Sequence, residues 1–132
     1  MIRRLAVVTG AVVASGVMIS VPAAAEPSSQ TIDCQYTLSA PYVVDVNGTQ
    51  MVTATVVHAA CPSAVPMLLE ACLTIPGKVG RCDQTNGNTT AQVYLSPYVP
   101  GLTYTARGRG CAAVPTPPTS ICSTMGPTSA VL

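Results

Sequence analysis

Apolar and polar residues alternate with a period of two along most of the chain after residue 33. In 102–108, for example, Leu102, Tyr104 and Ala106 share one face, while the residues between them are polar. This period is typical of a half-buried β-strand. The same pattern recurs in seven segments, which are 34–40, 51–58, 67–75, 78–82, 90–95, 102–108 and 121–125. The pattern therefore predicts an all-β fold of seven antiparallel strands in two packed sheets.

Two of the connections between these segments have strong turn sequences. Asn47-Gly48 lies between two apolar-rich runs and favours a two-residue hairpin, because both central positions of that turn adopt positive φ. Pro76-Gly77-Lys78 predicts a three-residue turn before the strand at 78–82. Each turn fixes which residues of its hairpin face each other.

All six cysteines follow residue 33, and an even number in a small exported chain indicates disulfides. The first two are equally far from the Asn47-Gly48 turn, and the third and fourth are equally far from Gly77. The last two flank a proline-rich stretch between two strand-like runs. An irregularity near Pro41 would break the first match. The predicted pairs are Cys34–Cys61, Cys72–Cys82 and Cys111–Cys122.

The first 25 residues have the features of a secretory signal peptide. Arg3-Arg4 precedes the apolar run 5–21, and Ala23-Ala24-Ala25 supplies small residues for cleavage. An uncleaved membrane anchor is the alternative. We expect secretion to the cell envelope or the medium, with no membrane attachment after cleavage. The predicted divisions are a signal peptide 1–25, a flexible segment 26–32, a sandwich domain 33–126 and a tail 127–132.

The stretch YVPGLTY, residues 98–104, resembles the L-x-P-G-x-x-Y corner of fibronectin type III and related immunoglobulin-like domains. The resemblance implies an immunoglobulin-like sandwich in which the Tyr104 hydroxyl bonds to backbone a few residues upstream. Tyr98 stands where Leu is usual, and the chain has no Trp. The composition, rich in Ala, Val, Thr and Pro, resembles that of small exported proteins of actinobacteria. The corner residues are Tyr98, Pro100, Gly101 and Tyr104.

Charge excludes two classes of partner. Only 8% of the residues are charged, and once 1–25 are removed the basic residues no longer outnumber the acidic ones. Binding of nucleic acid needs a strongly basic face, so we expect no nucleic-acid partner. The chain also has no polybasic segment to attract it to anionic lipid.

Catalytic and metal-binding motifs are missing from the sequence. His58 is the only histidine, no C-x₂-C pair occurs, and no G-x-S-x-G motif is present. The acidic residues are scattered rather than paired. We therefore predict a protein that is not an enzyme and holds no metal or cofactor. A packed or surface histidine is the expected role of His58.

Two surfaces are candidates for binding. The stretch 114–120 favours an extended polyproline conformation, and the last disulfide would tether it as a recognition loop or a site of sugar attachment. A plain hairpin tip is the alternative. Arg107 and Arg109, with Lys78 and Arg81, could form a small basic patch or only a solvated sheet face. The loop residues are Pro115, Thr116, Pro117, Pro118, Thr119 and Ser120.

These observations predict an exported, non-enzymatic module that binds an unknown protein or glycan partner. A carrier of a small apolar ligand is the alternative, because the Cys72-x₉-Cys82 hairpin resembles that of the neocarzinostatin-type apoproteins. A secreted enzyme inhibitor is a further alternative. The sequence leaves the oligomeric state open.

Overall fold

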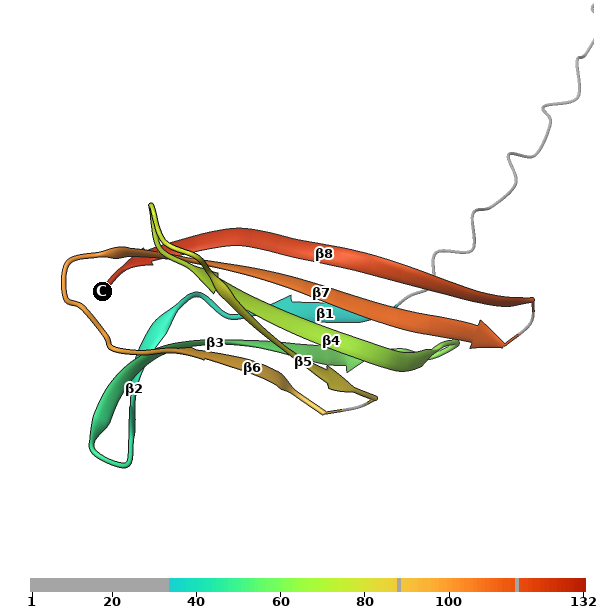
Figure 1. The fold of residues 1–132 in the computed structure, drawn as a ribbon. Helices are drawn as coiled ribbons and strands as arrows, with labels where there is room; N and C mark the ends of the chain where they lie inside the picture. The colour runs from blue at the N-terminus through green and yellow to red at the C-terminus, as the bar shows by residue number, and fades with distance from the viewer. Residues whose placement is uncertain (1–33, 88, 116) are drawn as a thin grey trace, which may run out of the picture.

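The computed structural model describes residues 34–132 except 88 and 116, so the predicted signal peptide and flexible segment lie outside the described residues. The described part is all-β, as predicted, and contains no helix (Figure 1). Its strands are β1 (Gln35–Leu38), β2 (Tyr42–Val46), β3 (Thr49–Ala60), β4 (Val65–Thr74), β5 (Arg81–Asn86), β6 (Ala91–Leu95), β7 (Thr103–Pro115) and β8 (Pro118–Val131).

The predicted number of seven strands is wrong, because β2 is an additional strand. It forms the first arm of the Asn47-Gly48 hairpin, and residues 39–41 separate it from β1. Pro41 has no N–H to donate to a ladder, which explains a break at this place. Gly48 has a φ of 81° and Asn47 a φ of 54°, as the hairpin turn requires.

The strands form two antiparallel sheets. In the first sheet β3 is central: β6 pairs with one of its sides, and β1 and β2 follow each other along the other side. The second sheet has the order β5-β4-β7-β8. Because β3 pairs with β6 and β4 with β7, the chain crosses repeatedly between the sheets, and residues distant in sequence meet in one core.

The core lies between the sheets and consists of small aliphatic side chains around one tyrosine. Their alternation along each strand is the one that the sequence predicts. The core residues are Val52, Ala54, Val56, Leu69, Ala71, Leu73, Ala91, Val93, Tyr104 and Ala106. Thr53 is a polar residue that is fully buried: its hydroxyl donates to Val93 O over 2.8 Å and accepts from Gln92 Nε2 over 3.0 Å.

Two glycines of β7 allow the sheets to approach closely. A Cβ atom on Gly108 would lie 2.7 Å from Cγ2 of Val56, and one on Gly110 would lie 2.5 Å from the ring of Tyr36. Gly108 and Gly110 are buried, whereas Arg107 and Arg109 between them are exposed. The sequence RGRG therefore places glycine against the first sheet and arginine on the outer surface.

The three disulfides have the predicted pairing. Cys72 faces Cys82 across β4 and β5, and Cys111 faces Cys122 across β7 and β8. The first pair depends on two irregularities that cancel. Both β1 and β2 pair with β3, but β1 pairs one residue out of the register that β2 follows, so that Leu38 faces Val56. A second shift, between Gln35 and Tyr36, restores the original register. The Cα atoms of Cys34 and Cys61 consequently lie 4.2 Å apart.

The expected loop at 114–120 is instead part of a long β-ribbon. Pro115 ends β7 and pairs with Pro118, which begins β8, so the connection is only 116–117. Proline fits here because β8 is an edge strand and these positions lie at strand ends. The expected tail also differs, since β8 continues to Val131 and its last residues pair with the start of β7.

Candidate functional site

A groove of about 320 Å³ crosses the outer face of the second sheet. It is lined by Glu70 and Cys72 of β4, by 107–109 of β7 and by 124–126 of β8. Three adjacent strands thus supply its walls and floor. The volume lies near the lower end of the range that small-ligand sites occupy, about 300–1,000 Å³.

A β-bulge in β8 forms one wall of the groove. The pairing between β7 and β8 passes from Ala106–Thr128 to Gly108–Met125, which leaves Gly126 and Pro127 opposite Arg107. Gly126 has a φ of 84°, and a Cβ atom there would lie 2.8 Å from the Ala106 carbonyl oxygen. Only glycine therefore fits this position without strain. The bulge bends the edge strand beside Arg107.

Two arginines supply the positive charge of the groove. Arg109 Nε lies 3.9 Å from Glu70 Oε1, and the side chains are 46% and 28% exposed. A pair this long and this exposed is weak. Arg107 is exposed and has no acidic partner within ion-pair distance among the described residues. Both guanidinium groups therefore retain donors for a carboxylate or other acceptor.

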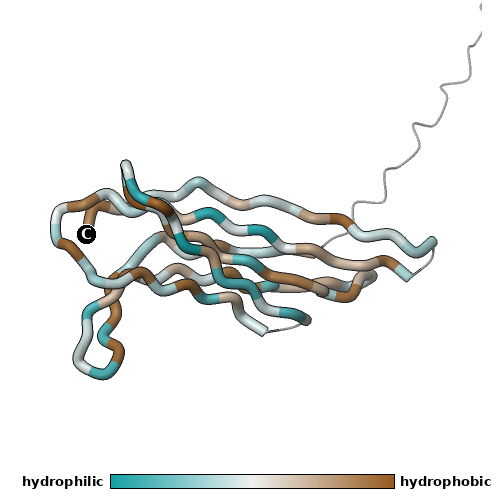
Figure 2. Tube along the Cα trace, viewed as in Figure 1, coloured by the Kyte–Doolittle hydropathy of each residue, from teal (hydrophilic) through white to brown (hydrophobic). Residues whose placement is uncertain are grey.

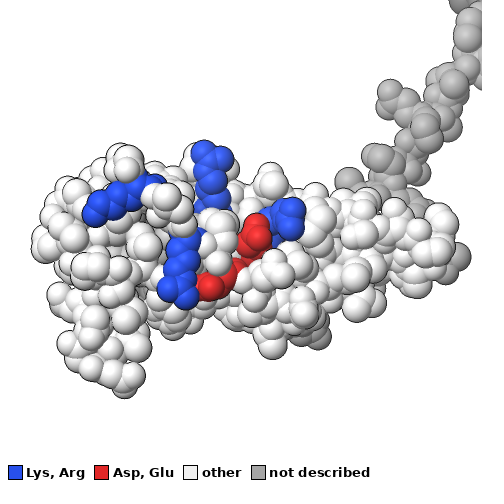
Figure 3. Space-filling view, in the orientation of Figure 1, with Lys and Arg blue, Asp and Glu red and all other residues white. Residues whose placement is uncertain are grey.

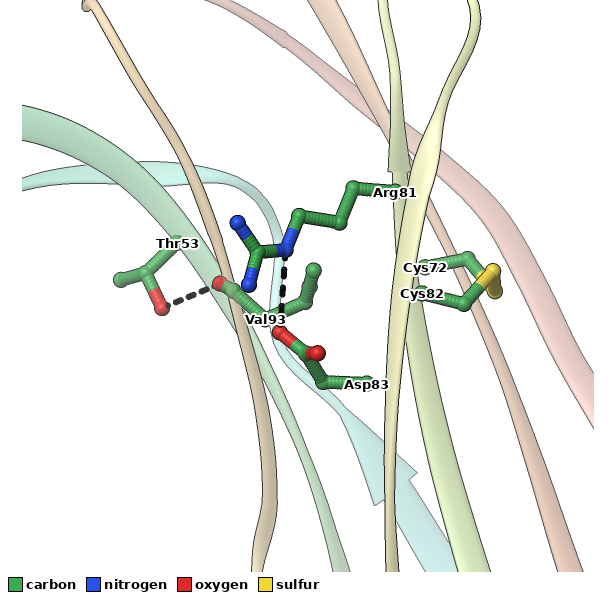
Figure 4. A network of polar contacts seen from close by, with 6 residues as sticks. All are labelled: Thr53, Cys72, Arg81, Cys82, Asp83 and Val93. Carbon is green, nitrogen blue, oxygen red and sulfur yellow. Dashed lines mark hydrogen bonds and ion pairs between the residues drawn. A yellow bond between two sulfur atoms is a disulfide. The ribbon is translucent and has the colours of Figure 1, made fainter.

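Alternate residues of β5 point to opposite faces of the second sheet. The Cys72–Cys82 disulfide lies on the groove side of the sheet, whereas Arg81 and Asp83 point toward Val93 of the first sheet (Figure 4). Arg81 Nε lies 3.5 Å from Asp83 Oδ2. This orientation follows from the register, because Arg81 pairs with the buried residue Leu73.

The predicted basic patch is only half assembled. Arg107 and Arg109 share the groove, but Arg81 points to the other side of the sheet and Lys78 lies in the turn before β5. Figure 3 shows blue and red side chains together over one part of the molecule, while the end at the β7–β8 turn is white on the face shown. Positive charge is thus interleaved with acidic groups rather than continuous.

The predicted corner positions the start of β7. The Tyr104 hydroxyl accepts a hydrogen bond from Val99 N over 2.9 Å and donates to Val99 O over 3.3 Å. Gly101 adopts a φ of 80° and donates its N–H to the Leu132 carbonyl. Tyr98 packs against the core with its ring centroid 6.4 Å from that of Tyr104. The corner is structural support and does not line the groove.

The other predicted positions also lie outside the groove. Pro115, Pro118, Thr119 and Ser120 are exposed strand residues near the tip of the β7–β8 ribbon, Pro117 is in its turn, and Thr116 is not described. His58 is half-buried in β3, where it pairs with Tyr36. Among residues 34–132 other than 88 and 116, no group of three or more His, Cys, Asp or Glu could hold a metal ion.

Two features of this structure have no local signal in the sequence. Thr124 and Gly126 line the groove, but only the bulge, which no turn sequence marks, brings them beside Arg107. Tyr36 lies against Gly110, and its hydroxyl is buried with no hydrogen-bond partner in the described part of the chain. Desolvation by burial raises the pKa of Tyr36 above its usual value of 10.0.

Comparison with known proteins identifies no family for this chain. The chain matches no protein-family model, and neither the curated proteins nor the solved structures contain a match to it. None of the described segments forms a helix that is long and apolar enough to cross a membrane.

Proposed function

We propose that this protein is an exported, non-enzymatic binding module that recognises carboxylate groups on an extracellular protein or glycan. The groove on the outer face of the second sheet is its binding site. Arg107 and Arg109 would donate hydrogen bonds to the partner, since guanidinium groups match the geometry of carboxylates. Glu70 would orient Arg109 within the groove.

The observation that carries the proposal is the pair of arginines held on a braced sheet. β7 is hydrogen-bonded on both sides, and disulfides join β4 to β5 and β7 to β8. A rigid support keeps donors in place before the partner arrives, which reduces the entropic cost of binding. The three disulfides also support export, because such bonds persist in oxidising compartments.

The groove favours a polar partner over an apolar cargo. Its lining includes two arginines and one glutamate, although most of the lining surface is apolar. The groove is only partly enclosed, whereas a carrier of a small apolar ligand needs a cavity that covers most of the ligand. An inhibitor would need an exposed reactive loop, whereas Pro115 and residues 118–120 belong to the paired strands β7 and β8.

We also propose that the sandwich is of the fibronectin type III or immunoglobulin-like type. The alternation of strands between the two sheets and the Tyr104 corner support this proposal. The fold itself carries no functional conclusion, because unrelated functions share it.

An array of acidic and neutral glycans and peptides tests the proposed function. The wild-type protein should bind members that carry carboxylates and not their neutral amide or ester analogues. The double variant R107A/R109A should lose at least about tenfold in affinity, as expected for removal of charge-assisted hydrogen bonds.

The matched control is the double variant K78A/R81A, which removes the same charge from β5 and the turn before it, outside the groove. It should bind like the wild type. An equal loss in both double variants would mean nonspecific attraction by positive charge, and no loss in R107A/R109A would show that this face is not the binding site.

A further inference from the structure

The two sheets end in four strand edges, and these edges differ in how they are protected. An edge presents N–H and C=O groups that can pair with another chain, and proteins usually block it with charges, proline, bulges or short strands. The first sheet has the β1–β2 edge and the β6 edge. The second sheet has the β5 edge and the β8 edge.

Three of these edges have protection of that kind. β5 is six residues long and carries Arg81 and Asp83, and it contacts β6, which is five residues long. The β1–β2 edge is interrupted at 39–41 and carries Asp45. At each of these three edges, a further strand could form only a short ladder or would bury a charged side chain.

β8 is different along its first half. It is 14 residues long and contains no Lys, Arg, Asp or Glu, and its residues 118–124 are all exposed. Figure 1 shows it at the outer edge of its sheet, and Figure 2 shows it largely pale, without strongly hydrophilic positions. The bulge at Gly126 and Pro127 protects the second half. Between Pro118 and that bulge, the segment Thr119–Met125 has no proline, so every residue keeps its N–H.

We propose that Thr119–Met125 of β8 pairs antiparallel with the same segment of a second copy of this chain. The two four-stranded sheets then form one continuous sheet. The uncharged edge meets an identical uncharged edge, so no charge is repelled or buried. Thr119, Ile121 and Thr124 are β-branched residues, which favour strand pairing.

Symmetry favours a second copy over an unrelated extended peptide. Antiparallel pairing about a two-fold axis uses both exposed edges and closes the assembly as a dimer. The axis would pass near Cys122, which is already bonded to Cys111 and so remains outside any exchange in the intact protein. Thr124 and Met125 also line the groove, so pairing would place two grooves on the same face of the joined sheet. This inference does not depend on what the groove binds.

Sedimentation velocity of the wild-type protein, from low micromolar to submillimolar concentration, tests the proposal together with hydrogen exchange. We expect a concentration-dependent shift from monomer to dimer. Over the same range, the amides of Thr119–Met125 should gain protection, while those of β5 should not change. A monomer throughout, or a dimer without added protection in β8, would overturn the proposal.

Two variants with the same added charge locate the interface. Ser120→Lys places a lysine on the exposed edge of β8, and Gln84→Lys places one on the exposed edge of β5. S120K should raise the dimer dissociation constant about fivefold or more, because symmetry duplicates each unfavourable pair. Q84K should not change it. Equal effects of the two variants, or a bound foreign peptide on β8 in place of a second copy, would contradict the proposal.

Discussion

The two faces of β7 are built from different residues for different purposes. Its inner face consists of Tyr104, Ala106, Gly108 and Gly110, all buried against the first sheet. Its outer face carries Thr103, Thr105, Arg107 and Arg109, which are exposed or half-buried. Small or fully packed side chains allow the close approach of the sheets, while the outer face has space for long polar side chains. One strand therefore supports the fold with one face and the proposed binding site with the other.

This comparison separates stability from binding. Substitutions on the inner face should change the free energy of unfolding, because they alter close contacts or buried hydrogen bonds. Substitutions of exposed outer residues should leave that free energy almost unchanged. The Cys72–Cys82 disulfide is the exception on the outer side, because it constrains the unfolded chain as well as the groove.

Removal of that disulfide should have the largest effect. The double variant C72A/C82A opens a link with a sequence separation of 10, and it should lose about 2.5 kcal/mol of unfolding free energy. Denaturant titration of the variant and the wild type measures the loss. A variant as stable as the wild type would mean that the groove side contributes nothing to stability.

Gly110→Ala should have the next largest effect. The added Cβ atom would lie 2.5 Å from the Tyr36 ring, and the resulting overpacking should cost about 2 kcal/mol. A double-mutant cycle with Tyr36→Ala isolates this contact. If Gly110→Ala costs the same with and without the Tyr36 ring, the close approach of the sheets is not the reason for glycine.

Tyr104→Phe should cost about 1 kcal/mol, because it removes a hydroxyl that bonds to both backbone groups of Val99. Tyr36→Phe is the matched comparison. It removes a buried hydroxyl without a partner in the described chain, so stability at neutral pH should stay the same or rise. Urea denaturation of the two variants should rank Tyr36→Phe above Tyr104→Phe, and the reverse order would contradict these hydrogen-bond assignments.

Alkaline pH should reveal the burial of Tyr36. Its pKa is raised in the folded protein, so the unfolded chain loses the phenolic proton first as pH rises through 10.0. Stability is therefore complete below that value and falls above it. Stability curves against pH should show a smaller alkaline loss in Tyr36→Phe than in the wild type, and identical curves would contradict the burial.

Local sequence patterns predicted much of the scaffold. The turn at Gly77 fixed the register that places Cys72 opposite Cys82, and the turn at Asn47-Gly48 fixed the register of β2 and β3. The predicted pair Cys34–Cys61 forms because two register shifts in β1 cancel. Period-two alternation identified the core. The strand β2 was missed although its turn was recognised, because Tyr42–Val46 does not alternate cleanly between apolar and polar residues. The strand β8 was predicted too short, because Pro118, Gly126 and Pro127 interrupt its pattern. The groove could not be predicted from local patterns, since the bulge at Gly126 is defined only by its pairing opposite Arg107.

Binding and stability measured in the same variant, R107A/R109A, test the role of the outer face of β7 most directly. We expect an unfolding free energy within about 0.5 kcal/mol of the wild type. We also expect at least about a tenfold loss of affinity for the carboxylate-bearing partner found on the array. Unchanged affinity in a stable variant would contradict the claim that the outer face of β7 is the binding face.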